Sequence, residues 1–254
     1  MTISRSLSIT VILSLFILSA CDFNSPQKVS DQKVTGWAVD DNGDSVYMRY
    51  TDKGKLESYT TYKNGTKEGI AKKFYDDGKV QFEIAYENGE KNGITKYFYD
   101  SGQLYRITTF VNGQEEGTQK KYYEDGALMA EVPYKKGKIQ PGLKEYTKSG
   151  KLKTQYPDLI IEPINKLAFE NKYILRCYLE GKPKGTDYFR VFNFDNDKMD
   201  YTVKLDEING AAEIPFFLQS GGYIMEKVRV RAEFKTPLRN IYVVEKVYNL
   251  ALDY

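Results

Sequence analysis

The chain contains no histidine among its 254 residues. This absence excludes Ser-His and Cys-His catalytic pairs, imidazole general bases and zinc sites built on histidine. A glycine-rich phosphate loop and a G-x-S-x-G nucleophile motif are also missing. No pair of carboxylates stands out from the 35 acidic side chains. We therefore predict a protein that is not an enzyme and uses no cofactor or metal. The absence of histidine does not exclude an enzyme that uses only carboxylates or a lysine for catalysis.

Cysteine is scarce, and so is net charge. The two cysteines are Cys21 and Cys177. If Cys21 carries lipid, as argued below, no disulfide framework can form. Cys177 falls on the apolar side of an alternating stretch, which favours a small buried side chain over a nucleophile. A formal net charge of +2 gives no basic field to recruit nucleic acid, so we predict no nucleic-acid partner.

Three classes of residue recur every 24 positions between Tyr47 and Leu152. One glycine series is Gly54, Gly78, Gly102, Gly126 and Gly150, and a second is Gly65, Gly89, Gly113 and Gly137. The aromatic series is Tyr50, Phe74, Phe98, Tyr122 and Tyr146. A shared period over about five units predicts a repeat architecture.

Each unit has the pattern of a β-hairpin. In residues 94–117, two β-rich runs flank Asp100-Ser101-Gly102, which suits a turn closed by a left-handed glycine. A longer loop from Asn112-Gly113 to Gly117 is expected to lead to the next unit.

The turn fixes a register that places Phe98 opposite Leu104. Continuing across the longer loop places Val80 beside Phe98 and Ile84 beside Ile94. The result is one ladder of rings and aliphatic side chains: Phe74, Val80, Phe98, Leu104, Tyr122, Leu128, Tyr146 and Leu152. The opposite face is expected to be solvated and to carry Lys73, Gln81, Glu83, Glu131 and Glu145.

The segment Phe98–Leu104, FYDSGQL, followed by an aromatic residue, Asn-Gly and a closing glycine, resembles the bacterial MORN-type repeat. It is similar in particular to the variant of the YwqK family, whose members are identified as antitoxins. The resemblance covers residues 45–156 and implies a repeat of β-hairpins. The fourth unit departs from the pattern through Lys136, Pro133 and Pro141, so we expect frayed pairing there.

Beyond Pro157 the period is lost. About seven β-rich runs separated by turn signals, without a helical stretch, predict a small β-sandwich. The strands expected are 158–164, 173–179, 188–194, 200–206, 211–218, 226–235 and 240–250. We interpret Asp195-Asn196-Asp197 as a turn rather than a calcium loop, because the glycine and distal glutamate of that motif are missing.

The N-terminus predicts export. Arg5 precedes the apolar stretch Leu7–Ala20, which is too short to span a membrane comfortably. The sequence Leu18-Ser19-Ala20-Cys21 resembles the bacterial lipobox, with cleavage before Cys21 and lipid on that residue. An ordinary secretory signal with an incidental cysteine is the alternative. The implied location is the bacterial cell envelope, with the outer membrane, periplasmic or surface side favoured over the inner membrane.

The predicted fold is all-β: an elongated single-layer antiparallel meander of about five 24-residue hairpin repeats, followed by a small β-sandwich of immunoglobulin-like architecture. The domains expected are a lipoprotein signal peptide at 1–20, a tether at 21–32, the repeats at 33–157 and the sandwich at 158–254. Trp37, the one tryptophan, is expected to cap the first rung of the ladder.

Two columns are candidates for binding. The first is the aromatic series of Tyr50, Phe74, Phe98, Tyr122 and Tyr146, which either packs within the sheet or forms an apolar interaction strip. The second is Lys72, Lys96, Lys120 and Lys144, which is either a solvated row or a set of contacts to an anionic polymer or lipid headgroup.

The sequence favours a non-enzymatic, lipid-anchored envelope protein whose repeat sheet binds an unknown protein partner. One alternative, implied by the YwqK resemblance, is an antitoxin or immunity protein that neutralises a toxin. Another is binding of anionic lipid or polysaccharide by the lysine column.

Overall fold

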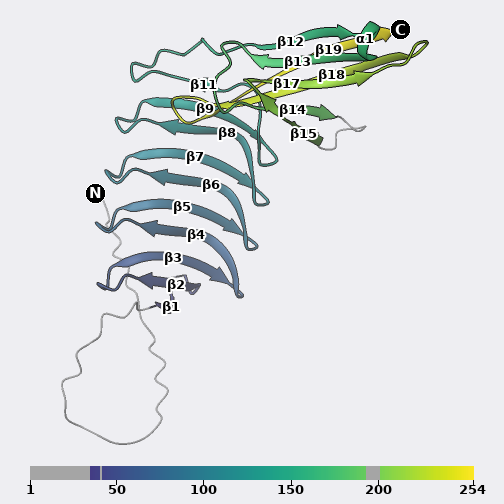
Figure 1. The fold of residues 1–254 in the computed structure, drawn as a ribbon. Coiled ribbons are helices and arrows are strands. Elements are labelled where there is room, and N and C mark those ends of the chain that lie inside the picture. Colours follow the sequence, from purple (N-terminus) through teal and green to yellow (C-terminus); the bar gives the residue numbers. More distant parts are fainter. Residues whose placement is uncertain (1–34, 41, 193–200) are drawn as a thin grey trace, which may run out of the picture. The chain divides into compact units, whose positions relative to one another are not determined.

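A computed structural model describes residues 35–40, 42–192 and 201–254. The regular secondary structure of the described chain is β-strand apart from a single turn of helix (Figure 1). The described residues form two compact units that divide between Met129 and Ala130, and each is described by itself. The expected signal peptide, Cys21, the tether and Asp195-Asn196-Asp197 lie outside the described residues.

The first unit is an antiparallel meander in which each strand pairs with the next along the chain. Its strands are β1 (Thr35–Val39), β2 (Ser45–Tyr50), β3 (Leu56–Lys63), β4 (Thr66–Phe74), β5 (Val80–Glu87), β6 (Glu90–Phe98), β7 (Leu104–Val111) and β8 (Gln114–Tyr122). This arrangement confirms the predicted meander of hairpins.

The turn at Gly102 has the predicted form. The amide of Gly102 donates to the Tyr99 carbonyl at 2.9 Å, and the amide of Tyr99 donates to the Gln103 carbonyl at 2.8 Å. Gly102 has a φ of 90°, a conformation that glycine adopts without steric penalty. Phe98 lies opposite Leu104, as predicted, and Phe74 lies opposite Val80.

The loop between repeats is shorter than predicted. Asn88 and Gly89 form a two-residue hairpin turn with φ values of 51° and 86°, and β6 begins at the next residue. Both φ values are positive, as in a type I′ turn. The closing glycine of the repeat, here Gly93, lies inside β6 with a φ of 95°, where the register shifts.

This bulge overturns the register predicted between repeats. Ile84 pairs with Thr95 rather than Ile94, and Glu83 pairs with Lys96, so Val80 is not directly opposite Phe98. The two-residue turn and the bulge beside Gly93 together shift the pairing of β5 with β6 by one residue from the predicted register. A one-residue change exchanges the two faces of a strand.

Register and alternation together sort the side chains of the first unit onto two faces. The ladder face carries Lys72 and Phe74 on β4, Val80 and Glu83 on β5, and Lys96 and Phe98 on β6. The opposite face, here called the threonine face, has a buried central row: Ala71, Ile84, Thr95, Thr108 and Gln119.

Two expectations about faces need correction. Glu83 lies on the ladder face rather than opposite it, because the bulge between Lys73 and Phe74 changes the phase of β5. Trp37 pairs with Tyr47 on the threonine face, where its ring contacts Tyr47 and Tyr62 at centroid distances of 5.0 and 5.1 Å. Trp37 therefore does not cap the ladder. At the first rung of the ladder, Tyr50, Leu56 and Tyr59 pack against the buried side chains of Ala38, Val46 and Met48.

The second unit opens with the weakened repeat. Most of β9 (Leu128–Lys135) belongs to it, and β9 pairs with two-residue strands, β10 (Lys138–Ile139) and β11 (Lys144–Glu145). The expected fraying around the prolines is confirmed by these short strands. Tyr146 and Leu152 still form a bridge, as the turn register predicts.

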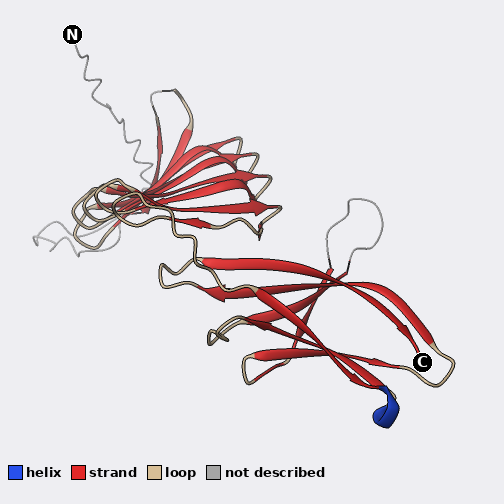
Figure 2. Cartoon of the chain, turned by 90° about the horizontal axis from the view of Figure 1, so that it is seen from above, coloured by secondary structure: helices blue, strands red, loops and turns tan. Residues whose placement is uncertain are grey.

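The rest of the second unit confirms the predicted sandwich (Figure 2). One sheet has the order β12-β13-β17-β16 and the other β15-β14-β18-β19. The elements are β12 (Leu159–Lys166), α1 (Leu167–Glu170), β13 (Lys172–Leu179), β14 (Asp187–Phe192), β15 (Tyr201–Leu205), β16 (Glu207–Ile208), β17 (Ala211–Phe217), β18 (Tyr223–Lys235) and β19 (Ile241–Asp253). The helix α1 and the short β16 were not predicted.

The core between the two sheets contains Leu175 and Cys177 from one sheet and Tyr188 and Val230 from the other, all fully buried. Burial raises the pKa of the Cys177 thiol to about 12, so the thiol is protonated at neutral pH. Cys177 thus has the environment of a core side chain, as the sequence indicates.

Glu145 joins the end of the repeats to the sandwich within the second unit. Its carboxylate was expected in solvent, but it is 1% exposed. Oε1 accepts hydrogen bonds of 2.6 Å from Thr236 Oγ1 and from Asn240 Nδ2, and Oε2 accepts one of 3.3 Å from the Tyr156 hydroxyl. Lys153 Nζ lies 3.8 Å from Oε2. These bonds supply partners for a charge that would otherwise be costly to bury.

The same junction has two further contacts. Arg231 Nη2 donates to the Ile139 carbonyl at 2.7 Å, and the rings of Tyr156 and Tyr242 stack with centroids 4.6 Å apart. Residues 130–157 are therefore packed with the sandwich, although the sequence placed the domain boundary at 157/158.

Replacing Glu145 with alanine should destabilise the second unit by about 3 kcal/mol, because Thr236 and Asn240 lose a charged acceptor in a buried site. Amide hydrogen exchange across β18 and β19 measures this change. The control is Glu162→Ala on β12, where the side chain is exposed and the expected change is within about 0.5 kcal/mol. Equal exchange in both variants would contradict the role given to Glu145.

Candidate interaction surface

The ladder face of the first unit carries the predicted rings in a half-buried state. Tyr50, Phe74, Phe98 and Tyr122 each recur at the end of a strand and are neither buried nor fully exposed. The Tyr59 ring packs against Phe74 with centroids 6.1 Å apart. Val80 and Leu104 lie opposite Phe74 and Phe98. The structure therefore brings these rings to one face as an apolar strip that is still partly open.

The lysine column shares this face, because Lys72 and Lys96 are each two residues from a ring on the same strand. Lys72 Nζ lies 2.7 Å from Glu83 Oε1, and Lys96 Nζ lies 3.9 Å from Glu83 Oε2. The hydrogen bond to Glu83 raises the pKa of Lys72, although partial burial acts in the opposite direction. Lys120 is exposed on β8. The face thus presents a Lys–Glu–Lys chain beside its rings.

The last member of each column lies in the second unit. The Tyr146 hydroxyl donates to Glu131 Oε2 at 2.9 Å, and this hydrogen bond raises the pKa of Tyr146. Lys144 Nζ lies 3.8 Å from the same carboxylate oxygen. Tyr146 and Lys144 therefore share Glu131.

A set of links between successive turns was not predicted. The Tyr75 hydroxyl donates to the Phe98 carbonyl at 2.8 Å, and Tyr99 repeats this bond to the Tyr122 carbonyl at 2.7 Å. Lys79 Nζ likewise reaches the Asp100 carbonyl at 2.9 Å. Tyr75 and Tyr99 are 24 residues apart and directly follow Phe74 and Phe98. This recurrence was the signal in the sequence for a link between turns. These bonds tie successive turns together along one edge of the sheet.

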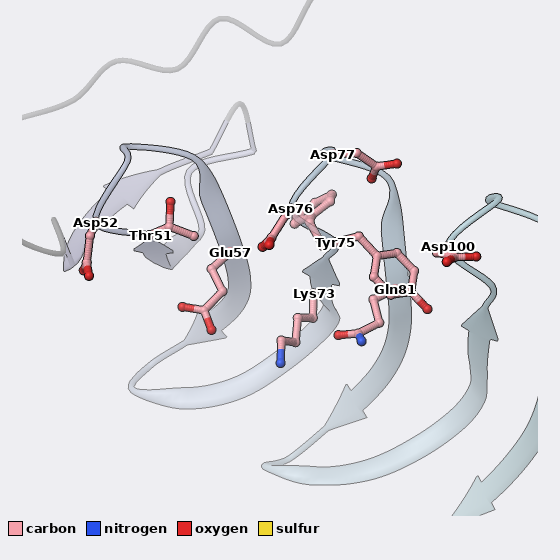
Figure 3. Close-up of a pocket in the computed structure, with 10 residues that line it drawn as sticks. Thr51, Asp52, Glu57, Lys73, Tyr75, Asp76, Asp77, Gln81 and Asp100 are labelled. Carbon is pink, nitrogen blue, oxygen red and sulfur yellow. The ribbon is translucent and has the colours of Figure 1, made fainter.

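A pocket of about 570 Å³ lies along this turn edge (Figure 3). Its walls include Glu57, Lys73 and Gln81 from the strands and Asp76 and Asp100 from the turns. In the described parts of the chain, no group of three or more Cys, Asp or Glu side chains is placed to hold a metal ion. The pocket is a polar recess between neighbouring hairpins.

The threonine face has a different composition. Register places one lateral row across five strands: Lys73, Phe82, Tyr97, Arg106 and Lys121. The guanidinium carbon of Arg106 lies 4.0 Å from the centroid of the Tyr97 ring, which is a cation–π contact. On the other side of the buried row, Lys91 Nζ lies 5.0 Å from the Phe110 ring centroid. This face therefore carries rings and cations side by side.

Comparison with protein families identifies the hairpins. The model of the MORN repeat variant matches three consecutive segments, residues 67–88, 91–112 and 115–136. Each segment begins in one of β4, β6 and β8 and contains the whole of the next strand. The match supports the predicted likeness to MORN-type repeats over less than half of the chain. No curated protein matches the sequence.

Among the described residues, none of the helices is long and apolar enough to cross a membrane.

Replacing Tyr99 with phenylalanine should destabilise the first unit by about 1 kcal/mol, because the Tyr122 carbonyl loses its donor. Hydrogen exchange across β8 measures the change. Burial raises the pKa of Tyr99 above 10.0, so the contribution should be fully present below about pH 10 and lost as pH rises through the folded-state pKa. Tyr86→Phe is the control, since the described contact of Tyr86 is to its ring, from Lys67 Nζ at 5.0 Å. Identical protection in wild type and Tyr99→Phe would contradict the link.

Proposed function

We propose that the protein is a non-enzymatic binding module whose repeat sheet captures another protein through the ladder face. The observation that carries the proposal is the placing of half-exposed rings in register on one face of a rigid sheet. Aromatic side chains of this kind commonly anchor protein interfaces. Because the turn links already order the sheet, binding does not have to pay for ordering it.

The ion pairs support a protein rather than an anionic lipid or polysaccharide as the partner of this face. Glu83 lies between Lys72 and Lys96, and its charge offsets theirs. A chain of opposite charges fits the polar rim that surrounds the anchors of a protein interface. Recruitment to an anionic surface would favour a row of cations without that carboxylate.

The cellular setting of the proposal comes from the sequence. Cys21, in its lipobox-like context, would carry the lipid that holds the protein at the cell envelope, with the tether presenting the repeats. The likeness to YwqK proteins gives the proposal a more specific form, in which the captured partner is a toxin. A neighbouring gene product that is toxic in the absence of this protein would support that form, and harmless deletion would count against it.

Truncating the rings at the middle of the ladder should weaken capture of the partner. We expect Phe98→Ala and Tyr122→Ala each to lower the affinity by roughly 30-fold, equivalent to about 2 kcal/mol for a central aromatic anchor. The measurement is crosslinking in the native cell with quantification of the captured protein, followed by titration with that protein once it is identified.

Two controls separate binding from folding. Cys177→Ala alters the sandwich core, and Phe217→Ala removes a ring that is 69% exposed on the sandwich surface. Both should retain capture, and circular dichroism should show that all four variants are folded. An equal loss of capture in every variant would argue for general unfolding and against the ladder face.

The lysine column gives a separate prediction. Replacing Lys72, Lys96, Lys120 and Lys144 with glutamine should leave binding to anionic liposomes at the weak level of the wild type. Co-sedimentation with liposomes at low and physiological salt measures this, since surface attraction is screened by salt. Strong, salt-sensitive binding that disappears in the glutamine variant would instead favour the headgroup alternative.

A further inference from the structure

The threonine face holds two buried polar atoms that have no hydrogen-bond partner, Thr95 Oγ1 and Arg106 Nε. They lie close together in the sheet, because Thr95 on β6 pairs with Thr108 on β7, and Arg106 lies two residues before Thr108 on the same face. Buried polar atoms without partners are rare in folded proteins, and each calls for an explanation such as a bound group.

The surrounding side chains do not supply the missing partner. Thr108 Oγ1 accepts a hydrogen bond of 3.1 Å from Gln119 Nε2, which also reaches Glu115 Oε1 at 3.4 Å. The Arg106 guanidinium lies over the Tyr97 ring, which supports its plane without accepting the Nε proton in the described contacts. The chain of side-chain hydrogen bonds therefore runs from Glu115 through Gln119 to Thr108 and does not include Thr95, the cross-strand neighbour of Thr108.

Both atoms can donate, which identifies the missing group as an acceptor. Arg106 Nε carries a proton and cannot accept, and the Thr95 hydroxyl can turn its proton toward a neighbouring oxygen. A carboxylate offers two oxygens and forms stronger hydrogen bonds with a guanidinium than a neutral acceptor does. The chemistry of the pair therefore favours a carboxylate.

The charged side chains around Thr95 and Arg106 also favour an acidic ligand. Lys121 lies directly across from Arg106 on the neighbouring strand, so two cations stand side by side at this end of the row. Glu115 feels the charges of Arg106, Lys91 and Lys121, which lower its pKa, but burial has the larger effect and raises it. Burial therefore disfavours the ionised form of Glu115, the carboxylate that this site already contains.

The lateral row that contains Arg106 is long enough to bind an extended peptide segment. Phe82 and Tyr97 have ring centroids 5.7 Å apart, and Arg106 and Lys121 continue the row across β7 and β8. Adjacent strands are about 4.8 Å apart, so the row from Lys73 to Lys121 extends over roughly 19 Å. Rings followed by cations suit a segment in which apolar residues precede acidic ones.

We propose that the threonine face is a second binding site, which takes an acidic side chain on an extended peptide segment of a protein partner. Arg106 Nε and Thr95 Oγ1 donate to the carboxylate, and Phe82 and Tyr97 pack against its apolar neighbours. Both donor atoms are covered in the free sheet, so the half-buried Arg106 side chain has to shift for the carboxylate to reach Nε and then Thr95, the inner donor. The inference rests on the proposed protein-binding role but uses the opposite face of the sheet from the ladder.

The test uses the mature chain and a capped synthetic peptide of about twelve residues, which extends over roughly 40 Å as a strand. The peptide has valine in its first half and aspartate in its second half, as the order of rings and cations in the row requires, and its matched partner has asparagine for every aspartate. Isothermal titration should show binding of the aspartate peptide, with the asparagine peptide weaker by about tenfold or more. Equal affinities for the two peptides, or no binding of either, would overturn the proposal.

Three variants assign the donors. Arg106→Gln should weaken binding of the aspartate peptide by about tenfold, and Arg106→Lys, which keeps the charge without Nε, should fall between that variant and wild type. Glu115→Gln should strengthen binding, because it removes a nearby carboxylate while keeping the hydrogen bond to Gln119. Unchanged affinity in Arg106→Gln would contradict the assignment.

Thr95→Val separates a ligand donor from a structural residue. It removes a buried hydroxyl that has no partner and keeps the shape, so the melting temperature should rise. If Thr95 is the inner donor, affinity for the aspartate peptide should fall several-fold in this more stable protein. A higher melting temperature with unchanged affinity would overturn the role of Thr95.

The ladder variant Phe98→Ala should bind the aspartate peptide as wild type does, because Phe98 lies on the other face. Failure of the peptide to bind, while Phe98→Ala still weakens capture in cells, would reject this inference and leave the proposed function intact. Vesicles of phosphatidylglycerol and phosphatidylcholine are the final probe. Vesicle binding that Arg106→Gln abolishes, without binding of the peptide, would assign the site to a lipid surface and overturn the proposal.

Discussion

The first unit depends on a few backbone positions with positive φ. Gly102 closes the turn inside a repeat, Asn88 and Gly89 close the turn between repeats, and Gly93 shifts the register one strand further on. Together these positions decide which residues face each other across β4 to β8. Since side chains alternate along a strand, the same positions decide which face each side chain occupies.

That sorting gives the sheet two chemically different faces. On the ladder face, half-buried rings lie beside lysines whose charges are offset by Glu83. On the threonine face, a buried polar row stops at Thr95, next to a guanidinium held over the Tyr97 ring. The bonds from Tyr75 and Tyr99 tie successive turns together, and both faces belong to the same sheet. We infer that one face offers apolar anchors and the other a site for an acid.

Much of this could be predicted from the sequence, because the 24-residue period is a local signal. The hairpins, the pairing of Phe98 with Leu104 and the sandwich strands all follow from turn residues and alternation. The pairing between repeats did not, since Gly93 was assigned to a loop although it is a bulge inside β6. Glu145 was expected in solvent because its partners, Thr236 and Asn240, are more than 90 residues away and only the folded chain brings them together. The orphan donors Thr95 and Arg106 were missed for a related reason, as a missing partner leaves no pattern in a sequence.

The pairing of β5 with β6 is the most direct test of the account, because the two faces exchange side chains if it moves by one residue. Cross-strand backbone nuclear Overhauser effects in isotope-labelled protein report this pairing directly. The account predicts contacts between Glu83 and Lys96 and between Ile84 and Thr95. Contacts between Ile84 and Ile94 instead would place Lys96 and Phe98 on the opposite face from Lys72 and Phe74 and contradict both binding surfaces.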